Sequence, residues 1–140
     1  MEFDASALPA DWQFKPVREV TVRASQRDPR KQRGKVFRYV DVSSVDNTLC
    51  KVRNVTELKG SDAPSRARKE IHANDVLFAT VRPTLKRAAL IPQELDGELA
   101  STGYCVLRAE PERVTPNFLY ECVLTDWFFD AIGKLERGAN

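Results

Sequence analysis

The hydrophobic pattern of the chain predicts a sheet followed by helices. Beyond residue 110 the apolar spacing is helical, since Leu119 and Val123 share a face behind Thr115 and Pro116, a capping residue and a first-turn proline. Asp126 is expected to cap a second helix. Before that point, β-branched, aromatic and other apolar residues fill five stretches bounded by turn residues, as is typical of strands: residues 36–42, 49–55, 76–81, 88–91 and 104–107. We therefore predict an α+β fold, with a curved, mostly antiparallel, barrel-like sheet and C-terminal helices.

Polar segments separate these elements. Residues 25–35, SQRDPRKQRGK, contain almost no apolar side chain and include Pro29 and Gly34, so they predict an exposed basic loop. Residues 59–65 are rich in Gly, Asp and Pro and predict a second loop. Both loops are connections in which binding residues are commonly held by a more rigid framework.

The size and composition of the chain indicate one domain. Its 140 residues are 42% apolar, enough for a core, and the mean hydropathy is −0.42. We expect residues 1–11 to form a tail and residues 12–140 a single domain, with Trp12 anchoring its start. No apolar run approaches the ~20 residues of a membrane span, and the acidic N-terminus lacks the layout of a signal peptide, which favours a cytoplasmic location.

The small net charge of +2 hides an asymmetry. Residues 1–93 contain 18 Lys and Arg against 11 Asp and Glu, a net of +7, whereas residues 94–140 contain 4 against 9, a net of −5. A domain polarised in this way can hold a polyanion on one side and meet another partner on the other. An ordinary solvated surface is the alternative explanation of the same charges.

Arginine and lysine on the predicted loops are the candidate binding residues. The planar guanidinium of arginine donates two parallel hydrogen bonds, which suits phosphate and guanine. Pro83 is expected to restrict Arg82 to an extended backbone and so to fix its place. For each candidate, a solvated cation or an ordinary turn residue is the alternative. The candidates are Arg27, Arg30, Lys31 and Arg33; Arg66, Arg68 and Lys69; Arg82, Lys86 and Arg87; and Ser101 and Thr102.

Motifs that carry catalysis are missing from the sequence. It has no GxGxxG, no P-loop and no GxSxG. His72 is its single histidine, and its three cysteines are widely spaced without a CxxC, which predicts reduced thiols and no zinc site. The acids show no clustered spacing of a nuclease. We therefore predict no catalytic residue and no metal site.

Several linked segments occur in order over most of the chain: LPADW at 8–12, YVDVSSVDN at 39–47, SRAR at 65–68, NDVLFATVRP at 74–83, ALIPQELDG at 89–97 and ASTGYCVLR at 100–108. Together they resemble the target-recognition domain of the DNA specificity subunit of type I restriction-modification enzymes. The resemblance implies sequence-specific binding of double-stranded DNA, reading one half of a bipartite target without catalysis by this subunit.

The same resemblance implies partners. Methyltransferase subunits, and through them the restriction subunit, would supply S-adenosylmethionine, ATP and magnesium chemistry, so no cofactor is expected on this chain. The family usually continues into a spacer helix beyond the point that corresponds to Asn140, so we expect the domain to stop short of that helix.

Two other functions stay open on the sequence alone. The chain would be a protein-interaction module if its acidic C-terminal helices, with Trp127 and Phe128, docked a methyltransferase while DNA was touched only weakly. A metal-dependent nuclease of unusual design is the third hypothesis.

Overall fold

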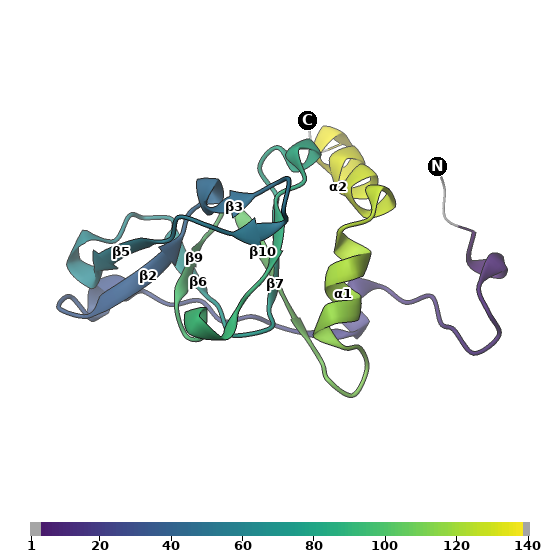
Figure 1. Cartoon of the computed structure of the whole chain (residues 1–140), viewed down its shortest axis with the longest axis horizontal. Coiled ribbons are helices and arrows are strands. Elements are labelled where there is room, and N and C mark those ends of the chain that lie inside the picture. Colours follow the sequence, from purple (N-terminus) through teal and green to yellow (C-terminus); the bar gives the residue numbers. More distant parts are fainter. Residues whose placement is uncertain (1–3, 139–140) are drawn as a thin grey trace.

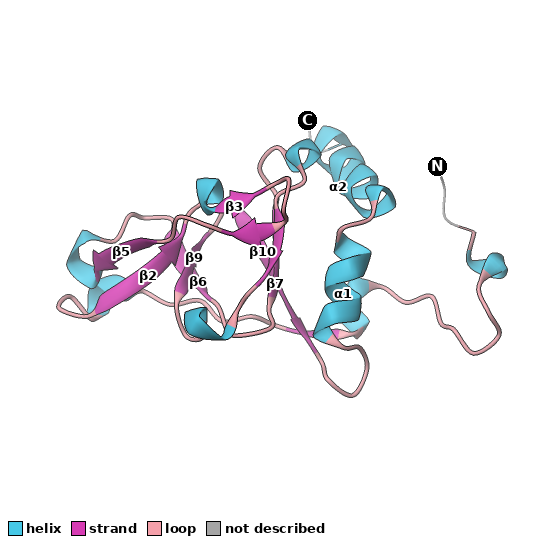
Figure 2. Cartoon of the chain, in the orientation of Figure 1, coloured by secondary structure: helices cyan, strands magenta, loops and turns pink. Residues whose placement is uncertain are grey.

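The computed structural model describes residues 4–138. Short strands are followed by two helices (Figure 1, Figure 2), as the hydrophobic pattern predicts. In this part of the chain the elements are β1 (Thr21–Val22), β2 (Val36–Val40), β3 (Val45–Asp46), β4 (Lys51–Val52), β5 (Thr56–Lys59), β6 (Ala67–Glu70), β7 (Val76–Ala79), β8 (Ala88–Leu90), β9 (Leu99–Ser101), β10 (Tyr104–Ala109), α1 (Pro116–Val123) and α2 (Asp126–Gly138).

The strands of the described residues pair into two four-stranded sheets and one two-stranded ribbon. The first sheet has the order β1-β10-β7-β8 and is antiparallel throughout. The second has the order β5-β2-β9-β6, with β2 and β9 parallel and the other pairs antiparallel, and β3 pairs with β4. The predicted α+β class and mostly antiparallel pairing are confirmed, but these sheets do not close into a barrel.

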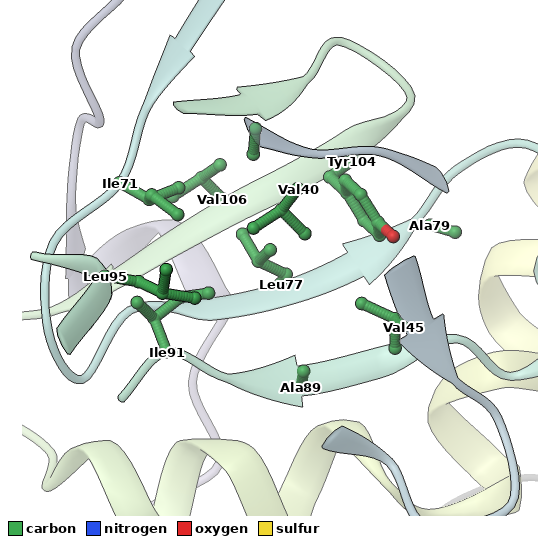
Figure 3. Packing of buried hydrophobic residues seen from close by; sticks show 11 residues of the cluster. Val40, Val45, Ile71, Leu77, Ala79, Ala89, Ile91, Leu95, Tyr104 and Val106 are labelled. Carbon is green, nitrogen blue, oxygen red and sulfur yellow. The ribbon is translucent and has the colours of Figure 1, made fainter. Parts of the chain in front are cut away.

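A buried apolar cluster joins the two sheets (Figure 3). Val40 from β2 meets Leu77 from β7 and Val106 from β10, and all three are buried. Removal of such apolar surface from water is the main favourable contribution to folding. Tyr104, at the start of β10, is also fully buried, and its phenol donates to the carbonyl oxygens of Asp41 at 2.7 Å and Val42 at 3.0 Å.

The helices cover the first sheet on its other side, at the right in Figure 1. Leu119 and Val123 of α1 and Phe129 of α2 are buried against a cluster that includes Val76 and Leu107. The predicted start of α1 is confirmed, because Thr115 Oγ1 accepts the amide of Phe118 at 3.2 Å and Pro116 occupies the first turn. Neither helix has the length and apolar content to span a bilayer within residues 4–138.

The start of α2 differs from the prediction by one residue. Thr125 Oγ1, and not Asp126, accepts the amide of Phe128 at 3.2 Å, so Thr125 is the capping residue and Asp126 is the first helical residue. The side chain of Asp126 instead pairs with Lys86.

Trp12 anchors the N-terminal segment on the helices, as predicted. Its ring lies 5.9 Å from that of Phe118, edge to face, and Phe14 lies 6.3 Å from Trp127. Trp12 nevertheless stays 52% exposed. The position of the domain boundary itself remains a prediction.

Several strands were mispredicted because their patterns are short or charged. In place of one strand over 49–55 there is the two-residue β4, since Cys50 and Asn54 on either side have left-handed backbones, with φ of 54° and 55°. The missed strands β3, β5, β6 and β9 are two to four residues long. Arg68 and Lys69 therefore lie on β6 and not on a loop.

A buried ion pair ties β10 to the start of β7. The carboxylate of Asp75 is 1% exposed and receives two parallel hydrogen bonds from Arg108, Nε to Oδ1 and Nη2 to Oδ2, each 3.0 Å. The backbone amide of His72 donates to the same carboxylate at 2.8 Å. These three hydrogen bonds compensate the cost of burying the charged carboxylate of Asp75.

Replacing Arg108 by methionine should therefore destabilise the protein strongly. Asp75 would keep its buried charge and lose its partner, which costs about 3–5 kcal/mol in comparable pairs. Urea unfolding measures this loss. Arg113→Met is the control, because its pair with Glu110 is half exposed and should contribute at most about 1 kcal/mol. Equal effects of the two substitutions would contradict the structural role of Arg108.

Candidate nucleic-acid interface

The first two predicted groups of cations lie beside each other. Gln26 pairs with Lys69 across an isolated antiparallel bridge, and the amide of Arg27 donates to the carbonyl of Arg68 at 2.8 Å. The guanidinium of Arg68 also lies 3.1 Å from the carboxylate of Asp28. The basic loop 25–35 is therefore attached along the edge of β6, although about 40 residues separate the two in sequence.

The turn between β9 and β10 connects the second group to the third. The amide of Thr102 donates to the carbonyl of Arg66 at 2.9 Å. On the other side of the turn, the carbonyl of Gly103 accepts both the amide and the hydroxyl of Thr80, at 2.9 and 3.1 Å. Thr80 opens the β7–β8 loop that carries the third group. We call the connected segments 25–35, 65–69, 80–87 and 101–103 the loop row.

Some of the predicted cations are exposed on this row and form no ion pair with other described residues. The side chains of Lys31, Arg33, Arg66 and Arg82 are exposed, and that of Arg87 is half-buried. Thr102 is exposed among them. These residues are available to an anionic partner.

Two other predicted cations instead hold the basic loop in place. Arg27 donates to the carbonyl of Gly97 at 3.3 Å and to Gln32 at 2.5 Å, and its guanidinium lies 5.0 Å from the ring centre of Phe37. Arg30 donates through Nε and Nη2 to the carbonyl of Ala63, at 3.2 and 3.1 Å. Their hydrogen-bonding capacity is therefore partly used inside the protein.

Three further predicted cations are also engaged. Besides its pair with Asp28, Arg68 donates to the carbonyl of Ser65 at 3.3 Å. Lys69 donates to the carbonyl of Tyr104 at 2.7 Å, and Lys86 pairs with Asp126. The pair with Asp126 raises the pKa of Lys86 above its ordinary value, so Lys86 stays charged.

Ser101 is a correction to the candidate set. It is fully buried on β9, where its hydroxyl accepts the amide of Gly103 at 3.1 Å. It supports the turn from inside, and burial removes it from contact with a partner. Of the two hydroxyl candidates only Thr102 faces solvent.

Arg82 departs from the expected backbone. The proline that follows disfavours helical backbone and was expected to keep Arg82 extended, yet its φ and ψ are 51° and 61°, in the left-handed region. The reason is the tight turn that begins there, in which the amide of Leu85 donates to the carbonyl of Arg82 at 3.0 Å.

Sequence reasoning missed the acids that position the cations. Asp28 accepts the amide of Arg30 at 3.0 Å besides pairing with Arg68, and Asp126 pairs with Lys86. The members of each pair are 40 residues apart, so no local spacing revealed them. Among the described residues no group of three His, Cys, Asp or Glu side chains is placed to hold a metal ion.

Comparison with known proteins gives these features a context. No protein-family model matches the chain. It is similar to the HsdS subunit from Thermoanaerobacter tengcongensis, with 45% identity and a TM-score of 0.84 over 85% of this chain and 30% of that one. A structure on complex assembly and conformational transition of the type I R-M system matches equally well, again with 45% identity, a TM-score of 0.84 and the same coverage of both chains.

A curated relative is a protein of the same kind. The type I restriction enzyme HindI specificity subunit of Haemophilus influenzae is 29% identical over 92 residues, which cover 64% of this chain and 19% of the relative. The fold is thus that of a target-recognition domain of HsdS. The chain is homologous to type I restriction specificity subunits and spans 30% of the solved subunit's length, one domain of it. The family resemblance seen in the sequence is confirmed.

Gly60 permits the close approach that seats the basic loop. A Cβ at this position would lie 2.2 Å from the carbonyl oxygen of Pro29 and 2.3 Å from that of Gln32, both backbone atoms. We expect Gly60→Ala to displace the loop and to lower the free energy of unfolding by about 1–3 kcal/mol. Gly34→Ala, in the same loop with no atom within 4 Å of the added methyl, is the control and should be neutral. Similar losses in both variants, measured by urea unfolding, would refute this role.

His72 predicts a pH dependence of stability. Partial burial lowers the pKa of His72, but its ring is hydrogen-bonded to Glu70 at 2.7 Å and Asp96 at 3.0 Å, and the net pKa is raised despite nearby Arg108. The stabilisation of the fold by the protonated His72 ring is therefore complete below the unfolded-state pKa of about 6.5 and is lost as pH rises through the folded-state pKa. Between about pH 6 and pH 8, the free energy of unfolding in urea should fall more for the native protein than for His72→Gln. Equal decreases would contradict the raised pKa of His72.

Proposed function

We propose that this domain binds double-stranded DNA in a sequence-specific manner and reads one half of a bipartite target for a type I restriction-modification complex, without catalysis of its own. The homology to specificity subunits supports this function at the level of the family. The loop row supports it at the level of residues, because it presents Lys31, Arg33, Arg66, Arg82 and Arg87 without internal ion pairs in the described residues.

The placement of these cations is the observation that carries the proposal. Phosphate contacts orient a protein on a duplex, and contacts to base edges give the sequence preference. A row of loops with several exposed cations fits the first task, and arginine with its planar fork fits the second. The remaining predicted cations are partly engaged inside the protein, so we place the main DNA contacts on these five cations and Thr102.

The partners of the domain follow from the same proposal. Methyltransferase subunits, and through them the restriction subunit, would carry the catalysis together with S-adenosylmethionine, ATP and magnesium. Such a complex works on DNA in the cytoplasm, which is the location we propose.

A second function is favoured by a separate observation, the aromatic surface of the helices. Phe118 is 48% exposed and Trp127 is 38% exposed beside Trp12 and Phe14. Phe128, which the sequence placed on this surface, packs inward against Phe78 at 5.1 Å. As a docking module the domain would bind a purified methyltransferase subunit and show no measurable affinity for duplex DNA.

Loss of Arg82 and Arg87 from the β7–β8 loop should weaken DNA binding. We expect Arg82→Ala combined with Arg87→Ala to lower the affinity for duplex DNA at least about tenfold, and to make its salt dependence shallower by about one unit of log–log slope for each lost phosphate contact. Fluorescence anisotropy over a salt series measures both quantities.

A matched control removes the same charge elsewhere. Arg18 and Arg113 lie near the opposite end of β10, beside Val20 and Glu110. Their double alanine variant should bind DNA nearly as the native chain does. If both double variants lose affinity equally, net charge and not the loop row determines binding.

A further inference from the structure

The β7–β8 loop is closed on itself by hydrogen bonds. The amide of Ala79 donates to the carbonyl of Arg87 at 2.8 Å where the strands leave the sheet. Inside the loop a 3-10 turn, η6 (Pro83–Leu85), is held by the amide of Lys86, which donates to the carbonyl of Pro83 at 3.0 Å. Pro83 itself is buried. The backbone of the loop is therefore set by its own contacts.

Two residues of this loop hold long side chains in an unfavourable backbone geometry. Arg82 has φ 51° and ψ 61°, and Lys86 has φ 55° and ψ 44°, so both are left-handed. Glycine, asparagine and aspartate adopt this region more readily than other residues. Strain of this kind persists where the surroundings fix it, and it concentrates at functional sites. The two side chains are thus presented from fixed backbone positions.

The loop is also tied to the second helix. Lys86 Nζ donates to the Oδ1 of Asp126, the first residue of α2. The partners are 47% and 80% exposed, and such surface pairs add little to stability. The consequence of the pair is geometric, because it joins the tip of the loop to a helix that the core holds through Phe129.

Arg82 and Lys86 consequently differ in what they can do. The ammonium of Lys86 is occupied by Asp126, whereas the guanidinium of Arg82 is exposed and has no ion pair among the described residues. Arg87, the other cation of the loop, is half-buried. Arg82 is therefore the side chain of this loop best placed to enter a groove of the duplex.

We propose that the Lys86–Asp126 ion pair positions the β7–β8 loop so that Arg82 reads a base edge in the major groove, with Lys86 and Asp126 acting as positioning residues. The inference rests on the proposed DNA-binding function and adds which residue of the loop gives sequence preference. A fixed guanidinium can donate to both acceptors of a guanine, O6 and N7, which a lysine at the same place cannot do in the same geometry.

The charge of Asp126 makes this proposal distinguishable from simple electrostatics. A carboxylate beside a DNA surface repels phosphate, so its removal on charge alone should strengthen binding to every duplex. A positioning role predicts that its removal weakens binding to the preferred duplex. The two accounts therefore predict opposite signs for the same substitution.

The test uses the 140-residue chain and a duplex selected by it from a randomised library, with a scrambled duplex for comparison. We expect Asp126→Asn to reduce the ratio of the two affinities at least fivefold without weakening binding to the scrambled duplex. Asp130→Asn removes the same charge one turn further along α2, where Asp130 acts on Lys86 only through its field, and should leave the ratio unchanged. Arg82→Lys should relax the preference at one base pair while keeping the charge.

A charge exchange provides the rescue. Lys86→Asp combined with Asp126→Lys should recover part of the ratio lost in Asp126→Asn. An unchanged ratio in Asp126→Asn would overturn the positioning role, and an unchanged preference in Arg82→Lys would overturn base reading by Arg82. Equal affinity of the native chain for all duplexes would refute both the inference and the sequence preference of the proposed function, and would leave only non-specific DNA binding. No binding to any duplex would refute the proposed function itself.

Discussion

The structure depends on the way Tyr104 joins the two sheets. Its ring is fully buried in the shared core, its phenol donates to the carbonyls of the two residues that follow β2, and its own carbonyl accepts a hydrogen bond from Lys69 of β6. The turn before it, Thr102 and Gly103, bonds to Arg66 on one side and Thr80 on the other. Because these hydrogen bonds are made around one buried residue, loops that are distant in sequence meet in one row.

This arrangement divides the basic residues into two kinds. Arg27, Arg30 and Lys69 donate hydrogen bonds to backbone carbonyls of other segments of the domain, and these bonds help to fix the loops. Arg66 and Arg82 are exposed on the loops thus fixed. Preorganised cations lose less conformational entropy on binding than cations on mobile loops. The engaged cations therefore contribute to the proposed DNA contact by holding the exposed ones in place.

The sequence predicted what local pattern determines. The spacing of apolar residues and the helix-capping residues predicted the α+β class, the longer strands and the start of α1 after Thr115. The failures have physical causes: β6 and β9 are short and lack an apolar period, and Arg82 is left-handed in the tight turn of its own loop despite the preference set by Pro83. Which cations are engaged by other side chains depends on partners such as Asp126, 40 residues from Lys86, and those pairings exist only in the folded chain.

The most direct test of the loop row is to map the DNA-contacting surface residue by residue. At 15.8 kDa the chain suits solution NMR, in which amide shifts are followed as duplex DNA is added. Our account predicts that the shifts concentrate at residues 31–33, 66, 80–87 and 102, and that the exposed face of α1 and α2 around Phe118 stays unperturbed. Perturbations concentrated on that aromatic face, with the loop row unchanged, would contradict it.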